Sequence, residues 1–447
     1  MSERVAVIGG GLSGLQCARR FAEAGHAVTL FEGRESLGGL ADAWTLGVPG
    51  QAPLRWDRHY HVTLLSDAHT RDFYAFAGVP GDDLRWVRTR TGFFDGRAVH
   101  DLTSGLDFLK LPALPLHAKL RLAASILYAS RVTDADRLDR VPVEGWLVRL
   151  GGRTLFERLW KPLLQAKLGD AWQESSAAFI WATIQRLYAA RRSGLKEEMF
   201  GHPAGGYAAV MAGAAEALGR LGVDLRTGAA VREIDAERRV RLAGGAASSP
   251  FDRVVLTTTP KVAAGLLPGL PGADAAALRS IDFQGIVCAA AVLDGPLDPR
   301  RRNYLTYLAG ERALPFTAVV EMSAFVDPDA EAGFGGRGLV YLPRYAPADD
   351  PFFSMGDDAV RDAFSAGLAE VCPGFSPERL LAFRVSRVRE VFPLPTLGFA
   401  ARVPAVDTAL PGVHLIGAAQ VRHATLNAND TLRWADEACG SVLSGDV

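Results

Sequence analysis

The chain has 447 residues, which suggests two or three domains, and its 49% hydrophobic and 22% charged residues are ordinary for a globular protein. A net charge of −1 gives no reason to expect a nucleic-acid partner. No apolar run is long enough for a membrane-spanning helix, and the first residues lack the features of a signal peptide. Four scattered cysteines without metal-ligand spacing favour a reducing, cytoplasmic location and no metal site.

The first 32 residues carry a strand–helix–strand pattern. Residues 5–8 are apolar and mostly β-branched, residues 15–22 are apolar at helical spacing, and residues 27–31 form a second strand pattern. Between the first strand and the helix lies a G-x-G-x-x-G motif. This order predicts a dinucleotide-binding loop at the positive end of a helix, with an acid after the second strand binding the ribose. The expected binding residues are Gly9, Gly11, Leu12, Ser13, Gly14 and Glu32.

A second G-x-G-x-x-G motif, residues 333–338, has the wrong context. It follows a polar turn and precedes a strand pattern at residues 339–342. We therefore expect a hairpin loop there rather than a nucleotide site.

The residues after Glu32 distinguish between dinucleotides. Gly33 and Arg34 are followed by Gly38, Gly39 and Leu40. A second glycine pair at this place resembles the flavoprotein family of monoamine oxidase, protoporphyrinogen oxidase and phytoene desaturase. The resemblance implies FAD, with the arginine and the glycine pair around its phosphates and ribityl chain. The family motif usually ends Gly-Gly-Arg, so Leu40 leaves one expected positive charge missing.

Two later segments resemble the same family. Residues 202–207 precede an apolar helix and short strands at 223–226, 230–234, 240–242 and 253–257. The resemblance implies that backbone near Val231 contacts adenine and that Thr258 follows the returning strand. Residues 412–417 and 427–431 then form a strand and a helix start, which Asn429 or Asp430 can cap. The residues implied to lie by the flavin are Gly417, Ala418, Leu426 and Asn427. The family often has aspartate at position 418.

Two inserts separate these segments. Residues 101–199 are mostly helical, and residues 276–395 contain strands and a helix at 357–371. The expected fold is therefore α/β: a Rossmann-like FAD-binding domain of the GR2 type (1–100, 200–275 and 396–447) with a discontinuous α+β substrate domain (101–199 and 276–395). A basic, leucine-rich helix near 106–127 could lie on a membrane surface. Packing against neighbouring helices is the favoured interpretation, because Pro112 and Pro115 shorten any amphipathic face.

Candidate catalytic residues follow the second glycine pair. His59 and His61 lie in a stretch that the resemblance places beside the flavin and that is similar to UDP-galactopyranose mutase. Either could act as a base or hold a substrate oxygen. Lys161 and Lys167 could bind an anionic substrate, and weaker candidates for the substrate wall are Tyr304 and Arg344.

These features predict an FAD-dependent oxidoreductase with non-covalently bound FAD. The family's oxygen-using amine oxidases often place a lysine near flavin N5, but this chain has no lysine after Lys261, and Cys439 falls too late to tether the flavin. The expected reaction is hydride transfer from a C–H bond of a small organic molecule, giving desaturation or C–N or C–O oxidation. Two alternatives stay open: redox-neutral chemistry resembling UDP-galactopyranose mutase, and a non-catalytic flavin-binding partner protein. The oligomeric state does not follow from the sequence.

Overall fold

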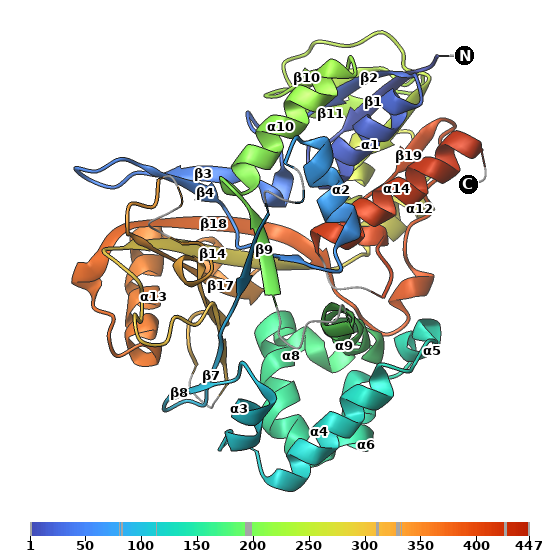
Figure 1. Ribbon diagram of the computed structural model, residues 1–447. Coiled ribbons are helices and arrows are strands. Elements are labelled where there is room, and N and C mark those ends of the chain that lie inside the picture. Colours follow the sequence, from blue (N-terminus) through green and yellow to red (C-terminus); the bar gives the residue numbers. More distant parts are fainter. Residues whose placement is uncertain are drawn as a thin grey trace.

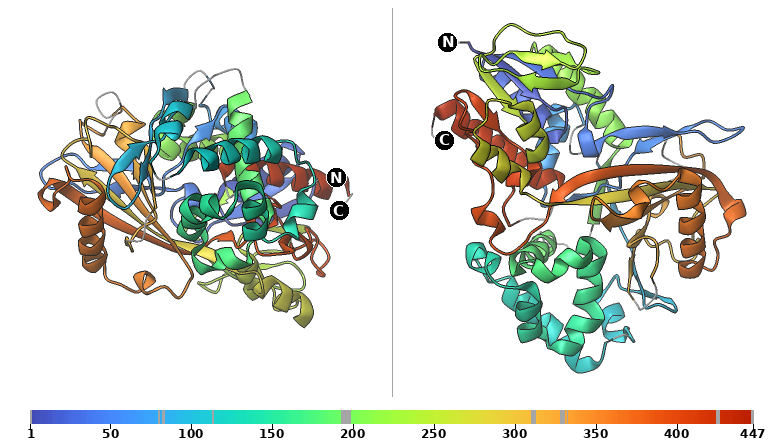
Figure 2. Two further views of the ribbon diagram at one scale, coloured as in Figure 1. Left: turned by 90° about the horizontal axis from the view of Figure 1, so that it is seen from below. Right: turned by 180° about the vertical axis from the view of Figure 1, so that it is seen from behind.

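The computed structural model describes residues 2–79, 81, 84–112, 114–192, 199–309, 313–327, 331, 333–423 and 427–445. Figure 1 shows three regions: a parallel sheet with its helices near both chain ends, a long antiparallel sheet beside it, and a group of helices below. The view from behind in Figure 2 shows the same three regions. No helix within the described ranges is long and apolar enough to cross a bilayer.

A five-stranded parallel sheet forms the nucleotide half, in the order β10–β2–β1–β13–β19. Its strands are β1 (Arg4–Ile8), β2 (Ala27–Phe31), β10 (Asp224–Arg226), β13 (Arg253–Leu256) and β19 (Val413–Leu415). Both faces are covered, which explains the continuous apolar runs in the sequence. Val5 and Val7 of β1 face one core, and Ala6 and Ile8 face the other. The predicted α/β Rossmann-like fold is confirmed.

Helices from distant parts of the chain cover the two faces of this sheet. One core includes residues of α1, α2, α10 and α14, and the opposite core includes residues of α11 and α12. The six helices are α1 (Leu12–Glu23), α2 (Ala68–Phe76), α10 (Gly206–Arg220), α11 (Pro260–Leu266), α12 (Gly272–Arg279) and α14 (Ala428–Ser444). The first and last helices, α1 and α14, pack against each other, so both ends of the chain build one layer.

A seven-stranded sheet lies beside the nucleotide half, in the order β18–β14–β17–β16–β15–β7–β8. Its strands are β7 (Thr91–Phe94), β8 (Val99–Asp101), β14 (Phe283–Leu293), β15 (Leu305–Leu308), β16 (Ala318–Glu321), β17 (Gly338–Ala346) and β18 (Leu380–Pro393). Helix α13 (Asp357–Val371), at the predicted bounds, covers one face. Residues 333–338 lead into β17, as expected for a loop before a strand.

The helical region contains more breaks than its sequence pattern suggested. Prolines interrupt it at 112, 115 and 142, and a π-helical turn (Phe156–Trp160) interrupts the later part. The helices are α3 (Gly105–Lys110), α4 (Leu116–Ala129), α5 (Ala135–Asp139), α6 (Val143–Gly151), α7 (Arg153–Leu155), α8 (Lys161–Leu168) and α9 (Ala177–Arg192). The single helix expected near 106–127 is therefore two helices, α3 and α4.

Smaller sheets accompany the two large ones. They are the hairpin β3–β4, the antiparallel pair β11–β12 and the three-stranded sheet β5–β9–β6. Their bounds are β3 (Ala43–Leu46), β4 (Leu54–Asp57), β5 (Thr63–Leu64), β6 (Leu84–Arg88), β9 (Met199–Pro203), β11 (Val231–Ile234) and β12 (Val240–Leu242). Strand β7, from the segment assigned to the nucleotide half, pairs with β15 of the large sheet. The division into two domains stays a prediction.

Candidate functional site

The glycine loop after β1 leaves one side of its backbone open. Gly9 has a φ of 110°, and Thr257 from β13's end donates its hydroxyl to the Gly9 carbonyl oxygen at 3.1 Å. A Cβ on Gly14 would lie 1.8 Å from that same oxygen, so no side chain fits there. A Cβ on Gly11 would meet nothing closer than the Cα of Gly39, at 3.9 Å. Gly14 therefore packs the helix on the loop, whereas Gly11 faces open space that a phosphate group can approach.

The first turn of α1 faces the same space. Leu12 and Ser13 begin this helix. Its N-cap is Gly11, which has no side chain to accept hydrogen bonds from the free N–H groups of the first turn. Such a helix start favours an anion, because its N–H groups carry partial positive charge.

Glu32 ties the two glycine-rich segments together. It follows β2, and its carboxylate accepts hydrogen bonds from the backbone N–H groups of Gly10 (2.7 Å) and Arg34 (2.8 Å). Each carboxylate oxygen retains another lone pair, so ribose hydroxyls could still donate to it. The sequence did not indicate this structural role, because the Glu32 carboxylate contacts the glycine loop only once β1 and β2 are paired.

The second glycine pair lies directly against the first loop. Gly38 has a φ of 113°, Gly39 has a φ of 62°, and the Gly38 N–H donates to the Gly10 carbonyl at 2.8 Å. The carbonyl of the next residue, Leu40, contacts Nδ1 of His59 at 3.2 Å. The two glycine motifs, which are separate in the sequence, therefore lie side by side and form one surface of backbone.

The other predicted cofactor residues lie at the same edge of the sheet. A Cβ on Gly33 would lie 3.4 Å from the side chain of Ala230, the residue before Val231 in β11. Thr258 follows β13, and its buried hydroxyl has no hydrogen-bond partner within the described part of the chain. Gly417 follows β19, and a Cβ on it would lie 3.3 Å from the Thr258 carbonyl oxygen.

The last segment begins at Ala418, in a short 3-10 turn, and continues into α14. Asn427 caps this helix by accepting a hydrogen bond from the N–H of Asp430 at 2.9 Å. The prediction that Asn429 or Asp430 is the cap was wrong. The Asn429 side chain instead accepts from the N–H of His69 at 2.9 Å and so joins α14 to α2. Leu426 lies outside the described residues.

These features fit a dinucleotide. All of them follow the carboxyl ends of parallel strands, where open α/β sheets bind ligands. They are the glycine loop, Glu32, the second glycine pair, Thr258 and Gly417. The open side at Gly11 and the unpartnered Thr258 hydroxyl supply room and a polar contact. The residues present therefore fit FAD.

Two histidines follow β4 and differ in their surroundings. His59 is buried, and its Nε2 lies 3.1 Å from the Ser386 hydroxyl on β18. Burial, and then the charge of Arg58, lowers the pKa of His59 to about 3. With both ring nitrogens engaged, His59 links the glycine pair to the large sheet. His61 stacks at 4.8 Å against Tyr207, and its buried Nδ1 has no hydrogen-bond partner among the described residues. Burial lowers the pKa of His61 to about 4, so the ring is neutral at pH 7.

Asp57 is a buried carboxyl next to this segment. It accepts a hydrogen bond from the N–H of Tyr207 at 2.7 Å and lies 3.9 Å from Nδ1 of His61. Burial raises the pKa of Asp57 to about 7, an effect that this hydrogen bond opposes. Near neutral pH the carboxyl therefore changes charge, whereas the neighbouring ring stays neutral.

A second polar group joins three elements. The hydroxyls of Tyr60 and Tyr345 are 3.0 Å apart, and Nζ of Lys167 lies 3.6 Å from the centre of the Tyr345 ring and 5.0 Å from that of Phe392. Lys167 comes from α8, Tyr345 from β17 and Phe392 from β18. Sequence reasoning missed both tyrosines as a pair, although Tyr60 stands between the two histidines.

The remaining substrate candidates make other contacts. Lys161, at the start of α8, pairs with Glu157 of the preceding π-helical turn at 3.0 Å. Tyr304 is buried in the core cluster against which Tyr60 and Tyr345 pack, and its ring contacts Phe325. Arg344 pairs with Asp350 at 2.7 Å. The structure therefore brings Lys167 and Tyr304 close to the segment that follows β4, whereas Lys161 and Arg344 are engaged in ion pairs.

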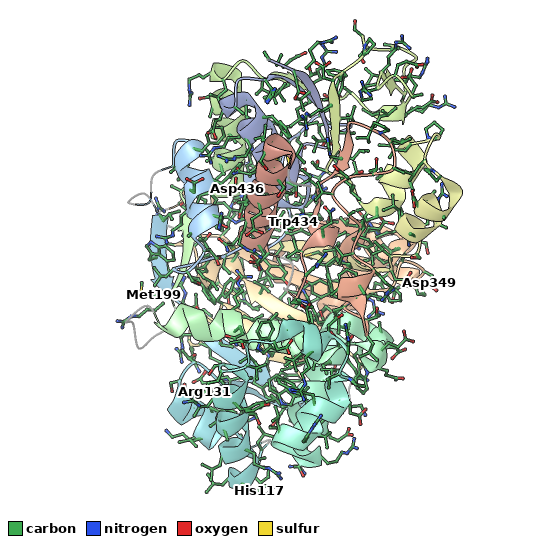
Figure 3. All side chains as sticks on the ribbon, turned by 90° about the vertical axis from the view of Figure 1, so that its right-hand side faces the viewer. His117, Arg131, Met199, Asp349, Trp434 and Asp436 are labelled. Atoms are coloured by element: carbon green, nitrogen blue, oxygen red, sulfur yellow. The ribbon has the colours of Figure 1, made fainter. Side chains whose placement is uncertain are left out.

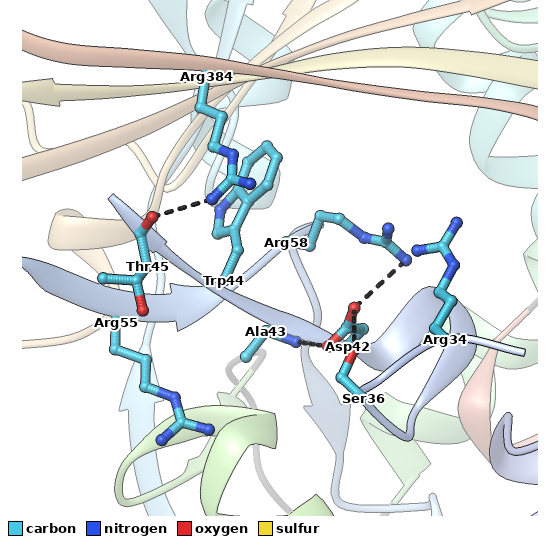
Figure 4. Close-up of a pocket in the computed structure, with 9 residues that line it drawn as sticks. All are labelled: Arg34, Ser36, Asp42, Ala43, Trp44, Thr45, Arg55, Arg58 and Arg384. Atoms are coloured by element: carbon cyan, nitrogen blue, oxygen red, sulfur yellow. Dashed lines mark hydrogen bonds and ion pairs between the residues drawn. The ribbon is translucent and has the colours of Figure 1, made fainter. Parts of the chain in front are cut away.

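Two hollows flank the site. One, of about 30 Å³, lies where α9, the end of β18 and residues 418–423 meet, and its apolar lining includes Phe179, Phe392 and Phe399. The other, of about 570 Å³, lies between the β3–β4 hairpin and β18 and is rich in arginine (Figure 4).

Comparison with known proteins identifies the family. The family model of flavin containing amine oxidoreductases matches residues 12–425. Zeta-carotene desaturase of Synechocystis sp. is 25% identical over 416 residues (80% of each chain), and hydroxysqualene dehydroxylase of Sinorhizobium fredii is 27% identical over 315 residues (66% of this chain and 70% of that protein). Among solved structures, reduced UDP-galactopyranose mutase superposes with a TM-score of 0.76 at 17% identity, over 99% of this chain and 94% of that one.

The match across most of the chain, together with a site whose backbone fits FAD, settles the family. The chain belongs to the flavin-containing amine oxidoreductases and is an FAD-dependent oxidoreductase.

Proposed function

We propose that the protein removes a hydride from a C–H bond of a small organic substrate and holds its FAD non-covalently. The observation that carries this proposal is the meeting of all predicted cofactor segments at one edge of the parallel sheet, next to the segment of His59, Tyr60 and His61. Bound FAD supplies the hydride acceptor. Cys17 and Cys439 are both buried in the core that packs α1 and α14 on the parallel sheet, which supports non-covalent binding.

The proposed cofactor contacts are divided among the segments. Backbone of the glycine loop and the first turn of α1 holds the phosphates, and Glu32 holds the ribose. The other contacts come from Gly33, Arg34, Gly38, Gly39, Leu40, Val231, Thr258, Gly417, Ala418 and Asn427, with Leu426 outside the described residues. The FAD domain would comprise residues 1–100, 200–275 and 396–447.

His59 and His61 have different roles in this proposal. His59 is a positioning residue, because both of its nitrogens contact the protein. His61, whose side chain is 22% exposed, holds a polar substrate atom through the ring nitrogen other than Nδ1, since Nδ1 lies against Asp57. Tyr60, Tyr345 and Lys167 form the polar wall of the substrate site, where the ammonium group over the Tyr345 ring can attract electron-rich substrate atoms.

We infer an apolar body for the substrate. The two relatives are named for acting on zeta-carotene and hydroxysqualene. In this chain, Phe179, Phe392 and Phe399 line the hollow at the junction of the helical region and the nucleotide half. At about 30 Å³ this hollow has room for about one water molecule, so it supplies an apolar wall rather than the whole substrate site.

We also propose that α4 contacts a membrane surface. Leu116, Leu120 and Leu127 are 64%, 61% and 45% exposed on this helix, which carries no acidic residue. His117 lies at the end of the molecule farthest from the nucleotide half, and Arg131, after the end of α4, lies nearer the middle (Figure 3). Exposed leucines flanked by basic groups favour an anionic bilayer.

Flotation with vesicles that contain anionic lipid tests this contact. Leu116→Ser combined with Leu120→Ser should remove binding, whereas Leu221→Ser, at a 41% exposed leucine after α10, should not. Equal binding by both variants would contradict the proposal.

The reaction is tested by the visible spectrum of the purified protein and by anaerobic titration. Bands near about 370 and 450 nm that are released on denaturation identify non-covalent flavin. Bleaching of the longer-wavelength band by apolar candidate substrates supports hydride removal. Turnover only after prior reduction, without net electron transfer, would favour redox-neutral chemistry instead. Bound FAD that no substrate reduces and that supports no turnover would favour a partner protein.

A further inference from the structure

The hollow between the β3–β4 hairpin and β18 has an excess of positive charge. Four arginines line it, Arg34, Arg55, Arg58 and Arg384, with Asp42 as the one carboxylate. Its volume of about 570 Å³ is in the range of small-molecule sites. Figure 4 shows the guanidinium groups of Arg34 and Arg58 pointing toward each other at one end of the hollow.

Arg58 is held at the second glycine pair. Its Nη2 donates to the Gly39 carbonyl at 2.5 Å and lies 3.8 Å from the Asp42 carboxylate. Its side chain is only 11% exposed, and its buried Nε has no hydrogen-bond partner within the described ranges. Burial, followed by the charge of Arg34, lowers the pKa of Arg58, and Asp42 opposes this effect only in part.

The other arginines leave donors free for a ligand. Within the part of the chain that the structure describes, the guanidinium of Arg34 has no recorded hydrogen bond or ion pair. Arg384 donates to the Thr45 carbonyl at 3.0 Å and lies 4.7 Å from the centre of the Trp44 ring. These contacts fix its position and still leave N–H groups for an anion, since a guanidinium has five.

Two guanidinium groups that face each other, with a carboxylate beside Arg58 only, repel unless an anion lies between them. Arginine pairs suit phosphate in particular, because each guanidinium can form two parallel hydrogen bonds to its oxygens. We propose that this hollow, named here the arginine pocket (Arg34, Arg55, Arg58 and Arg384), binds a phosphate-bearing group, with Arg34 and Arg58 as its inner contacts.

The position of Arg58 gives this proposal a specific consequence. The motif at the second glycine pair lacks its usual arginine at Leu40. Arg58 comes from the end of another strand, yet it places a positive charge on the carbonyl of the preceding glycine, Gly39. If the phosphate is that of the cofactor, Arg58 replaces the missing charge, and in this case the inference rests on the proposed FAD binding. A phosphorylated substrate is the second source of the same chemistry.

Two binding measurements separate these sources. The first is the affinity of the flavin-free protein for FAD, followed by flavin fluorescence. The second is calorimetric titration of the FAD-loaded protein with inorganic pyrophosphate. The variants are Arg34→Gln and Arg58→Gln, and the control is Arg361→Gln, an exposed arginine on α13 that pairs with Asp358.

A tenfold or larger loss of FAD affinity in Arg34→Gln and Arg58→Gln, but not in Arg361→Gln, would show that the pocket holds the cofactor's phosphates. Leu40→Arg should then restore affinity to Arg58→Gln. Unchanged FAD affinity, with pyrophosphate binding lost in the same two variants, would assign the pocket to a substrate. If Arg58→Gln does not fold, pyrophosphate binding by Arg34→Gln still tests the pocket, because Arg34 is exposed.

Wild-type affinities for FAD and pyrophosphate in both pocket variants would overturn the inference. They would also remove Arg34 from the proposed cofactor contacts, while hydride removal and FAD binding through the other contacts would stand. If the protein takes up no FAD at all, the proposed function fails, whereas pyrophosphate binding still tests the pocket.

Discussion

The nucleotide edge and the substrate side of this protein are built in different ways. At the nucleotide edge, backbone of Gly9, Gly11 and Gly38 forms the surface, and short-range motifs determine it. On the substrate side, Tyr60 and Tyr345 meet although they are 285 residues apart. Residues that are adjacent in the sequence determine the conformation of a backbone site. A site made of side chains depends instead on how helices and strands pack together. Substitutions at the two places should therefore fail in different ways.

The largest effect is expected for Gly14→Ala. The added Cβ would lie 1.8 Å from a backbone oxygen of Gly9, which cannot move without breaking the turn. The free energy of unfolding should fall by more than about 3 kcal/mol, as measured by urea denaturation. A loss below about 1 kcal/mol would mean that the loop tolerates a shift of α1.

Gly11→Val should separate cofactor binding from folding. The backbone at Gly11 has φ −75°, which any residue adopts, and the added atoms point into open space. Stability without cofactor should change by less than about 1 kcal/mol. The affinity for FAD should fall at least about 100-fold, because the side chain occupies the place of the phosphates. Yellow protein with normal FAD affinity would remove Gly11 from the site.

Asp57→Asn should change how stability depends on pH. The raised pKa of about 7 means that the folded protein binds this proton more tightly than the unfolded chain. The resulting stabilisation is complete below pH 3.8, the carboxyl's ordinary pKa, and is lost as the pH rises through about 7. Between pH 5 and pH 8, wild type should lose about 2–3 kcal/mol relative to Asp57→Asn, which keeps an acceptor for Tyr207.

Urea unfolding of both proteins at the two pH values measures this difference. His61→Gln is the control for coupling to the neighbouring ring, 3.9 Å away. An equal stability difference at pH 5 and pH 8 would show that Asp57 titrates normally.

The smallest effect is expected for His61→Ala. The ring contributes one hydrogen bond to substrate in our proposal, so anaerobic flavin reduction should slow about tenfold while FAD stays bound. His59→Ala should by contrast weaken FAD binding, because it removes the contacts to Leu40 and Ser386. Identical behaviour of the two variants would contradict the different roles assigned to them.

Much of the nucleotide half followed from the sequence. The strands at 4–8 and 27–31 lie within one residue of where apolar periodicity placed them, and in the substrate half the helix at 357–371 does too. The sequence did not reveal β18, because arginines at 384, 387 and 389 interrupt its apolar pattern. They are accommodated because one side of the strand faces the hairpin and the other faces α13, and each arginine reaches a polar or aromatic partner.

Site residues that lie close together in the sequence could be predicted, whereas those brought together by packing could not. Glu32 and the glycines could be identified from spacing alone. The cap at Asn427 could not, since three neighbouring polar residues compete for that role. Tyr304 and Arg344 were chosen from strand position only, and packing directs them into the core and toward Asp350. The contact between Lys167 and Tyr345 could not be predicted, because it depends on the packing of α8 against β17.

The length of β18 limits how this protein can change. Arg384 at the arginine pocket and Ser386 at His59 are two residues apart and lie on the same face of a regularly paired stretch. A single inserted residue between Ala382 and Arg384 would turn both side chains to the opposite face. Insertions in the loop after Pro393 would leave them in place. Relatives of this protein should therefore differ in length around β18 but not within it. A change in the length of β18 would alter the arginine pocket and the contact to His59 at the same time.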